Sequence, residues 1–434
     1  MAELLSVGLD VGTTTSQLVV SRLQVENRAS AFSVPKMEII RRDIIYKGAV
    51  RFTPLLDKDR VDAHALQTWL AQEYELAGIR QEQVDTGAVI ITGETSRKEN
   101  ARAVMETLAA FAGEFVVTTA GPHLESVLAA KGAGADTYSR QTGKTVLHMD
   151  IGGGTANLAW IENGNIQKTG CLNVGGRLVK VEDGRIVYVS PVAQGLMSVT
   201  AVEDLTPLAN MLVQALEMAA GLRSPTALLS KLWTQEAGAV WETPGIPEVI
   251  SFSGGVADCI GKDLPDLIYG DMGPILGKAI RQSLLCQGPF RLGEETIRAT
   301  VIGAGCHSTQ LSGSTVFYQN VTFPLKNLPV ILWGQTPEES GILACSESAT
   351  TYAQVCCLAD RIARERKAQP VYVAMEADMA KALGHALQLR LPKDHPILCI
   401  DRVSLEEGSY LDVGAPVGPC LPVVVKTLVL ANKL

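Results

Sequence analysis

Two short segments far apart in the chain share one construction, and they restrict the fold more than any other feature. In Leu9–Thr15 and in Met149–Thr155, an apolar strand-like run ends in an aspartate that is followed by a turn of glycine and threonine. Glycine lets backbone N–H groups approach phosphate oxygens, threonine hydroxyls add donors, and a nearby carboxylate can order a hydrated Mg²⁺. Two such turns facing each other would hold a nucleoside triphosphate between two related domains.

The composition limits the class of protein. The chain has 434 residues, 47% of them hydrophobic, and a net charge of −8, so two or more domains are expected. No Lys/Arg block is longer than Arg41-Arg42, no apolar stretch reaches the length of a membrane span, and Asp10 interrupts the first apolar run before a signal sequence could form. Nine cysteines without a Cys-x-x-Cys pair favour reduced thiols. We expect a soluble cytoplasmic protein that binds neither nucleic acid nor membrane.

Strand-like and helix-like segments alternate along the chain, which predicts an α/β fold. A β-hairpin is expected from residues 5–10 and 16–21, and the second motif repeats this plan with strands over 144–150, 157–161 and 166–172. The other predicted strands are 88–92, 115–118, 248–253, 296–300, 370–375 and 396–401. The predicted helices are 62–77, 97–112, 124–131, 207–222, 226–233, 275–285, 301–309, 352–367 and 377–389.

A third glycine motif follows the first two. It is Ser251–Ala257, where a strand ends in two glycines. In this order the three motifs resemble the actin/Hsp70/sugar-kinase ATPase superfamily. The resemblance implies ATP and Mg²⁺ as ligands, with the metal held mostly through its water molecules by Asp10 and Asp150. It implies phosphate binding by Gly12, Thr13, Thr14, Thr15, Gly152, Gly153, Gly154 and Thr155, and adenosine binding by Gly254 and Gly255.

The same resemblance implies how the chain is divided. We expect actin-like ATPase domain I over 1–143, domain II with a helical insertion over 144–300, and an interdomain helix, a return to domain I and a C-terminal α/β module over 301–434. The predicted fold class is therefore α/β, with two actin-like, ribonuclease H-like ATPase domains flanking a nucleotide cleft. The small residues of Ile302–Gly305 resemble the second interdomain helix, although tight packing alone would also explain them.

Glu125 is the candidate catalytic base, acting together with Asp10 and Asp150. It begins Glu125–Gly134, which resembles the first interdomain helix of the superfamily with its water-orienting acid or amide at the start. A carboxylate there would align a water molecule with the γ-phosphate. The competing interpretation is a solvated glutamate that the helix dipole favours in a first turn. Asn157 stands where Hsp70-like relatives have an acidic residue, so the cation bound there in those proteins is not assumed here.

Four other patterns have ordinary structural explanations. Thr142–Thr145 resembles the end of a P-loop, but the first glycine is missing and a strand follows where a helix is required. His148 shares a strand face with Asp150 and is expected to be a hydrogen-bonded core histidine. Residues 62–67 lack the glycine of the Asp-x-His-x-x-Gly corrinoid motif and fit a helix. Residues 92–97 provide capping hydroxyls for a helix, and a substrate or switch role for them stays open.

Segments outside the ATPase motifs make the resemblance more specific. These segments are Ser6–Thr15, Asn27–Ser30, Ile91–Thr95, Ala120–Val127, Cys171–Leu178, Leu311–Thr315 and Pro422–Leu428. With them, the whole chain resembles the ethanolamine ammonia-lyase reactivating factors, the EutA family.

The family resemblance implies a chaperone-like ATPase. Its hydrolysis of ATP would drive release of inactivated cobalamin from ethanolamine ammonia-lyase, so that intact adenosylcobalamin can enter, and adenosylcobalamin would be a partner only indirectly. Two domain arrangements would alternate with the nucleotide state, and the lyase-binding surface is sought between Gly175 and Thr243 and after Gly313. The family also implies association with a bacterial microcompartment. The alternatives are a small-molecule kinase of the same superfamily and a nucleotide-dependent actin-like assembly protein.

Overall fold

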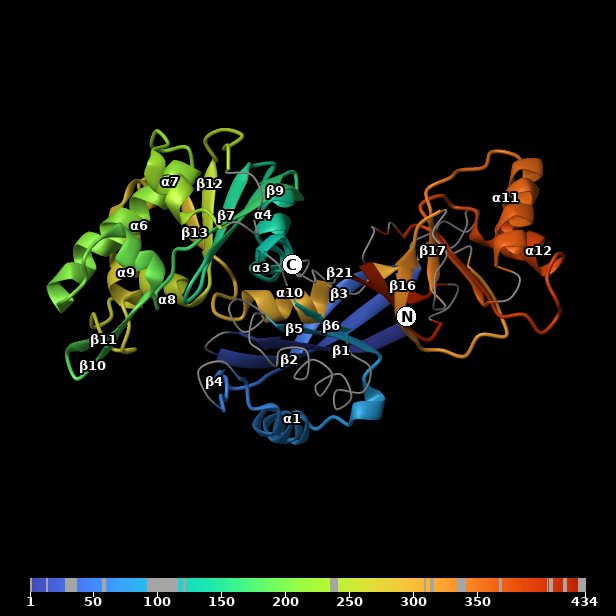
Figure 1. Ribbon diagram of the computed structural model, residues 1–434, viewed down its shortest axis with the longest axis horizontal. Helices are drawn as coiled ribbons and strands as arrows, with labels where there is room; N and C mark the ends of the chain where they lie inside the picture. Colours follow the sequence, from blue (N-terminus) through green and yellow to red (C-terminus); the bar gives the residue numbers. More distant parts are fainter. Residues whose placement is uncertain are drawn as a thin grey trace.

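The structure, a computed structural model, has three parts, each built around a sheet (Figure 1). Domain I lies lowest in this view with β1 to β6, domain II lies at the left with β7 to β13, and the C-terminal module lies at the right. The residues that the structure describes are 2–12, 15–27, 37–56, 60–91, 116–119, 122–234, 241–307, 310–312, 316–333, 341–366, 369–403, 405, 409–416 and 420–427. The predicted helix over 97–112 and the motif at 92–97 lie outside them.

Domain I is built on a six-stranded sheet in the order β3-β2-β1-β5-β6, with β4 paired to β2. The first three strands form an antiparallel meander, whereas β5 lies parallel to β1 and β6 parallel to β5. The strands are β1 (Ala2–Val11), β2 (Thr15–Asn27), β3 (Met37–Lys47), β4 (Arg51–Phe52), β5 (Thr86–Ile91) and β6 (Val116–Thr119). Helix α1 (Ala63–Ala77) packs on β1 and β2, and Asp62 caps it by accepting a hydrogen bond from the Ala65 N–H. Residues 62–67 therefore belong to a helix, as predicted.

Domain II repeats this topology with five strands. Its sheet has the order β9-β8-β7-β12-β13, in which β7, β8 and β9 form an antiparallel meander and β12 and β13 continue parallel to β7. The strands are β7 (Val146–Ile151), β8 (Ala156–Glu162), β9 (Asn165–Leu172), β12 (Val249–Ser253) and β13 (Phe290–Leu292). Each domain thus has three antiparallel strands followed by two parallel ones. This repetition confirms the predicted α/β class with two actin-like domains.

Helices cover both faces of the domain II sheet, and side-chain alternation along β7 decides which helices each face meets. Met149 and Ile151 enter the core shared with α6, α8 and α9, whereas Val146 packs with α3 and α4 on the other face, which His148 and Asp150 share. The helices are α3 (Pro122–Gly132), α4 (Ala135–Thr142), α5 (Pro191–Leu196), α6 (Leu205–Ala219), α7 (Ala227–Leu232), α8 (Gly255–Gly261) and α9 (Gly273–Gln282). An unpredicted hairpin, β10 (Val179–Glu182) and β11 (Arg185–Val189), extends away from the sheet (Figure 1).

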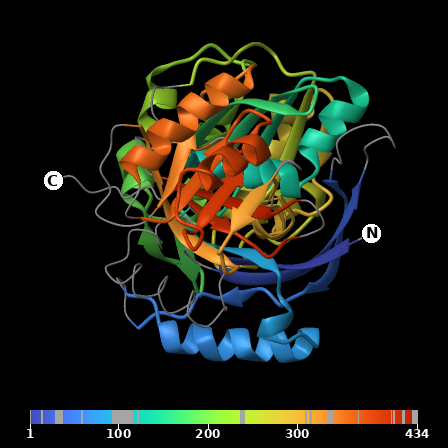
Figure 2. The same ribbon diagram turned by 90° about the vertical axis from the view of Figure 1, so that its right-hand side faces the viewer.

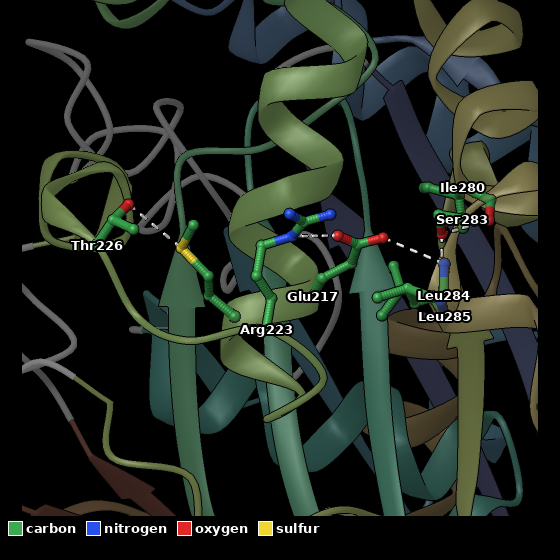
Figure 3. A network of polar contacts seen from close by, with 8 residues as sticks. Glu217, Arg223, Thr226, Ile280, Ser283, Leu284 and Leu285 are labelled. Carbon is green, nitrogen blue, oxygen red and sulfur yellow. Dashed lines mark hydrogen bonds and ion pairs between the residues drawn. The ribbon is translucent and has the colours of Figure 1, made fainter.

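The apolar helix α6 carries one buried carboxylate, Glu217, and Figure 3 shows the groups that donate hydrogen bonds to it. Arg223 Nε donates to one Glu217 oxygen over 2.8 Å, and the Leu284 N–H donates to the other over 3.1 Å. The Ser283 hydroxyl caps the same turn by accepting from the Leu285 N–H. Because both carboxylate oxygens have donors, the charge ties α6 to the segment after α9.

Helix α10 (Ala299–His307) lies between the two domains and crosses α3 closely (Figure 1). A Cβ added at Gly132 of α3 would overlap the Ala299 carbonyl, and one at Gly303 of α10 would overlap the Leu128 carbonyl. The small residues at this crossing therefore serve close helix approach. The predicted strand over 296–300 is wrong, because residues 294–298 form a bend and turn and the helix begins at Ala299. Its β-branched residues imitate a strand locally, and contacts with both domains override that preference.

The C-terminal module has an eight-stranded sheet in the order β14-β21-β20-β16-β17-β18-β19-β15. Strands β16 to β19 are parallel, and α11 and α12 pack on one face of them (Figure 2). The elements are β14 (Gln310–Leu311), β15 (Phe317–Gln319), β16 (Leu325–Ile331), β17 (Ile342–Cys345), α11 (Tyr352–Glu365), β18 (Val371–Met375), α12 (Ala380–Gln388), β19 (Ile397–Ile400), β20 (Ser409–Val413) and β21 (Pro422–Thr427). Strands β14 and β21 contact β3 and β6, so the module adjoins domain I.

Within the described part of the chain, no helix combines the length and the apolar character needed to cross a bilayer.

Candidate functional site

The first aspartate turn joins β1 to β2. The Gly12 N–H donates to the Thr15 carbonyl over 3.0 Å and closes the turn, and the Thr53 hydroxyl donates to the Gly12 carbonyl over 2.7 Å. Asp10 is partly buried just before the turn. Thr13 and Thr14 lie outside the described residues. The turn is therefore fixed by backbone bonds next to a carboxylate.

The second turn joins β7 to β8 in the same way. The Gly152 N–H donates to the Thr155 carbonyl over 2.9 Å, which is the counterpart of the bond in the first turn. A neighbouring loop supports it, because the Gly176 and Arg177 N–H groups donate to the Gly152 and Gly153 carbonyls over 3.0 and 2.7 Å. Because two of its carbonyls accept hydrogen bonds from this loop, the turn has a fixed shape.

The glycines of the second turn are not required by the fold itself. A Cβ added at Gly154 would meet nothing within 4 Å, one at Gly152 would lie 3.8 Å from the Thr155 carbonyl oxygen, and one at Gly153 would lie 3.5 Å from the Arg177 side chain. None of the three has a positive φ. Larger residues would fit the turn, so the three glycines leave open space above the backbone, which suits a ligand that approaches N–H groups closely.

Asp150 lies one residue before the end of β7 and is buried among hydroxyl groups. Ser253 on β12 donates to its Oδ1, and the Thr300 side chain on α10 also hydrogen-bonds it. Burial raises the pKa of Asp150 to about 6, and the two hydroxyl hydrogen bonds oppose that rise. The carboxylate thus connects domain II to the interdomain helix.

His148 is a hydrogen-bonded core histidine, as predicted. Its two ring nitrogens lie 3.1 Å from the Ser251 hydroxyl and 2.9 Å from the Ser253 hydroxyl. Because Ser253 gives its only proton to Asp150, it accepts from His148 Nε2–H, and Nδ1 accepts from Ser251. Burial, and secondarily Arg291, lowers the pKa of His148 to about 3, which keeps the ring neutral.

The two glycines after β12 differ in what requires them. Gly254 has φ +86°, and a Cβ there would overlap the Ile151 carbonyl, so the fold needs glycine at this position. Gly255 begins α8, and the nearest atom to a Cβ there is Ile297 Cδ1 at 4.0 Å. A Cβ would therefore fit at Gly255 but not at Gly254, and the adenosine contacts of both glycines stay a prediction.

Glu125 lies in the first turn of α3 and is 8% exposed, which excludes the interpretation as a solvated glutamate. Asn157 Nδ2 donates to Glu125 Oε2 over 2.8 Å. Asn157 on β8 stands directly opposite Asp150 on β7. The structure therefore brings Glu125 near the strand pair that carries Asp150 and the second turn. The Ser126 hydroxyl also links α3 to β9, because it donates to the Gly170 carbonyl over 3.3 Å.

Sequence reasoning missed two residues at this site. Asn157 received no role, although its contact with Glu125 depends on strand register. Arg177 also received none: its Nε lies 3.0 Å from Asp271 Oδ2, and its guanidinium lies 5.7 Å from the ring centroid of Phe52 in domain I. The only available signal was that Arg177 falls in the family-like segment 171–178.

The groups present fit a magnesium nucleotide by their chemistry. Mg²⁺ prefers oxygen donors, keeps much of its water and is commonly held by one or two carboxylates with substrate phosphates. Asp10 and Asp150 supply two carboxylates beside turns with exposed backbone. Across the residues described, no group of three or more His, Cys, Asp or Glu side chains could hold a metal ion. The donor set thus matches a metal that arrives with phosphates.

The paired turns on two sheets of the same topology define the class of the protein, which is that of the actin-like ATPase fold. The chain belongs to the family of the ethanolamine utilisation protein EutA, which matches residues 2–350 and 335–431. It is 38% identical to the ethanolamine ammonia-lyase reactivase EutA of Escherichia coli strain K12, over 98% of both chains. It is 37% identical to the protein of that name from Salmonella typhimurium strain LT2, again over 98% of both.

Among solved structures, an exopolyphosphatase from Cytophaga hutchinsonii is similar with a TM-score of 0.42 and 12% identity, over 69% of this chain and 96% of that one. This likeness is too remote to add to the argument.

Proposed function

We propose that the chain is an ATP-dependent reactivating factor for adenosylcobalamin-dependent ethanolamine ammonia-lyase, which promotes exchange of damaged cobalamin for intact adenosylcobalamin. The observation that carries the proposal is the 38% identity to a reactivase over 98% of both chains. Similarity of that extent includes the C-terminal module, whereas the ATPase motifs alone would fit many functions of this fold. Adenosylcobalamin would be met only inside the lyase.

The proposed chemistry is hydrolysis of ATP between the two turns. Gly12 and Gly152 would shape the two turns, which their N–H groups close. The N–H groups of Gly153 and Gly154 and the hydroxyls of Thr13, Thr14, Thr15 and Thr155 would hold the phosphates, and Gly254 and Gly255 would lie against the adenosine. Asp10 and Asp150 would hold Mg²⁺ mostly through its waters, and the metal would supply positive charge to the phosphates. Glu125 would orient the attacking water and take its proton.

The proposed coupling runs through the two helices between the domains. Glu125 lies on α3 and Thr300 on α10, and these helices cross at Gly132 and Gly303. Loss of the γ-phosphate would change the contacts of both helices, and a crossing with small residues permits them to slide. A surface that binds the lyase in only one arrangement would convert this change into release of cobalamin.

The proposal includes the division and the location of the chain. We place domain I at 1–143, with its last helices α3 and α4 packed across on the domain II sheet, domain II at 144–300 and the remaining parts at 301–434. The lyase-binding surface is sought between Gly175 and Thr243 and after Gly313. A cytoplasmic location in association with a bacterial microcompartment belongs to the same proposal, through the family's part in ethanolamine utilisation.

The test is reactivation of an inhibited lyase. Purified protein is incubated with Mg·ATP, free adenosylcobalamin and ethanolamine ammonia-lyase that carries cyanocobalamin, and recovered lyase activity is measured. Recovery that needs ATP supports the proposal. Hydrolysis of ATP without recovery refutes it and favours an assembly function, which sedimentation with ATP would detect, or a small-molecule kinase, which transfer of labelled phosphate would detect.

A further inference from the structure

One face of the domain II sheet carries a row of polar positions below α3. Asp150 on β7 pairs with Asn157 on β8, and Asn157 pairs with Cys171 on β9. Directly opposite residues of antiparallel strands project to the same face. Glu125 reaches this face from α3, because Asn157 Nδ2 donates to it. Asn157 therefore contacts the candidate base and lies directly opposite Asp150 on the neighbouring strand.

The orientation of the Asn157 amide follows from its partner. A carboxylate oxygen accepts hydrogen bonds, so the NH₂ group of Asn157 faces Glu125, and Oδ1 is the second arm of the same amide. Asn157 is 4% exposed, and its Oδ1 is buried with no hydrogen-bond partner among the described residues. A buried amide oxygen that stays unpaired is costly, so this oxygen is expected to accept from a donor that the described residues do not supply.

From this geometry, and resting on the proposed ATP hydrolysis, we propose that Asn157 binds the attacking water together with Glu125. Nδ2 holds Glu125 Oε2 in place, and Oδ1 accepts one hydrogen of the water while Glu125 accepts the other. The water oxygen then forms a bond to the γ-phosphorus, and the bond from that phosphorus to the bridging oxygen breaks. The electron pair of that bond leaves with ADP, and the water proton passes to Glu125 and from there to solvent.

An amide suits this position better than the acid of Hsp70-like relatives. A second carboxylate 2.8 Å from Glu125 would repel it, and burial would favour a proton shared between the two. A base that already holds a proton cannot accept one from water. Asn157 instead donates to the Glu125 carboxyl group and holds it in one orientation.

Three variants separate the two contacts of the amide. Asn157→Asp keeps acceptor oxygens but removes the donor to Glu125. Asn157→Ser is too short to place either a donor or an acceptor where the amide has them, and Asn157→Leu keeps the volume of the side chain without a polar group. We expect each to lower single-turnover ATP hydrolysis about 100-fold or more, the scale of a positioned general base. Affinity for a non-hydrolysable Mg·ATP analogue, measured by calorimetry, should stay unchanged. Cys171→Ala is the matched control, because Cys171 is a buried neighbour on the same face without a role in the proposal.

A double-mutant cycle tests whether the amide works through Glu125. If Asn157 and Glu125 hold one water, the double variant Asn157→Ser/Glu125→Gln should hydrolyse ATP no more slowly than Glu125→Gln alone. Additive losses, or turnover by the Asn157 variants that equals the control, would overturn the inference. Chemical unfolding identifies any variant that fails to fold, and Asn157→Asp, the nearest in shape, then decides. Failure of the proposed function would appear in the unchanged chain, as binding of ATP without hydrolysis, alone or with the lyase. Failure of this inference alone would appear only in the Asn157 variants, so the two failures are distinguishable.

Discussion

Gly154→Ala tests whether the second turn is built for a ligand or for the fold. A Cβ at Gly154 would meet no atom within 4 Å, and Gly154 is not among the residues with positive φ. At a position that accepts alanine, the substitution stabilises a protein by about 0.4–1 kcal/mol through the unfolded state. The free energy of unfolding should therefore stay equal or rise slightly.

The same methyl group would disturb a bound phosphate. It would stand in the space through which a phosphate oxygen approaches the backbone N–H groups. A hydrogen bond to a charged group contributes about 1.5–3 kcal/mol, so loss of one corresponds to a decrease in nucleotide affinity of about 10- to 100-fold. Gly154→Ala should therefore fold normally and bind ATP poorly.

Gly303→Ala is the matched substitution with the opposite expectation. Its Cβ would lie 2.6 Å from the Leu128 carbonyl carbon and overlap the carbonyl oxygen, and overpacking of this kind costs about 1–3 kcal/mol or more. Urea unfolding measures stability, and calorimetric titration with a non-hydrolysable Mg·ATP analogue measures affinity. If Gly154→Ala binds that analogue as tightly as the unchanged chain, the second turn does not hold phosphates and the reasoning is refuted.

Three further outcomes are expected. Burial raises the pKa of Asp150 to about 6, so the charge of Asp150 destabilises the ligand-free fold above that pH and ceases to do so as the pH falls. Asp150→Asn should therefore raise the free energy of unfolding at pH 8 by about 1–3 kcal/mol and abolish Mg·ATP hydrolysis. A lower free energy of unfolding of Asp150→Asn in urea would contradict this. The pKa of His148 is lowered to about 3 in the fold, so the neutral ring contributes its full stability above the unfolded pKa of about 6.5, and this contribution falls by about 2 kcal/mol at pH 5. Urea titrations above pH 6.5 and at pH 5 should therefore show a smaller loss of stability in His148→Gln than in the unchanged chain. An equal loss would refute the assignment of His148 as a neutral buried ring. Arg177→Ala removes the cation–π contact with Phe52 between domain II and domain I, which contributes about 0.5–1 kcal/mol. Small-angle scattering should therefore give a larger radius of gyration for this variant than for the unchanged chain. An equal radius would show that the contact does not hold the two domains together.

The sequence sufficed for the parts of the fold that depend on local pattern. Predicted strands over 144–150, 157–161 and 166–172 correspond to β7, β8 and β9, because apolar runs separated by glycine turns determine a meander. The repetition of the aspartate turn also predicted that the two sheets share a topology. Residues 296–300 could not be assigned in this way, since their turn is fixed by contacts with both domains, such as Gln17 Nε2 to the Ile297 carbonyl at 3.0 Å.

The candidate site was predictable only as far as residue type and motif allow. Asp10, Asp150 and the turn glycines stand out because their order is repeated, and their roles remain proposals. The part played by Asn157 could not be predicted, because its contact with Glu125 depends on the pairing of Asp150 with Asn157 and on where α3 crosses the sheet. The open space at Gly154 and the overlap at Gly303 likewise depend on tertiary contacts, although both residues are glycines in short motifs.

The placement of the site groups suggests why hydrolysis would move the domains. Glu125 belongs to α3, while Thr300, which hydrogen-bonds Asp150, belongs to α10. Gly132 and Gly303 bring these helices into backbone contact, and a crossing of small residues permits the helices to slide. A γ-phosphate between the turns would fix both helices through Glu125 and Asp150, and its loss would release both together. Under the proposed function, the ATPase site and the coupling between the domains would use the same two helices, so a variant that forces the crossing apart, such as Gly303→Ala, should weaken the coupling of hydrolysis to lyase reactivation more than it slows hydrolysis itself.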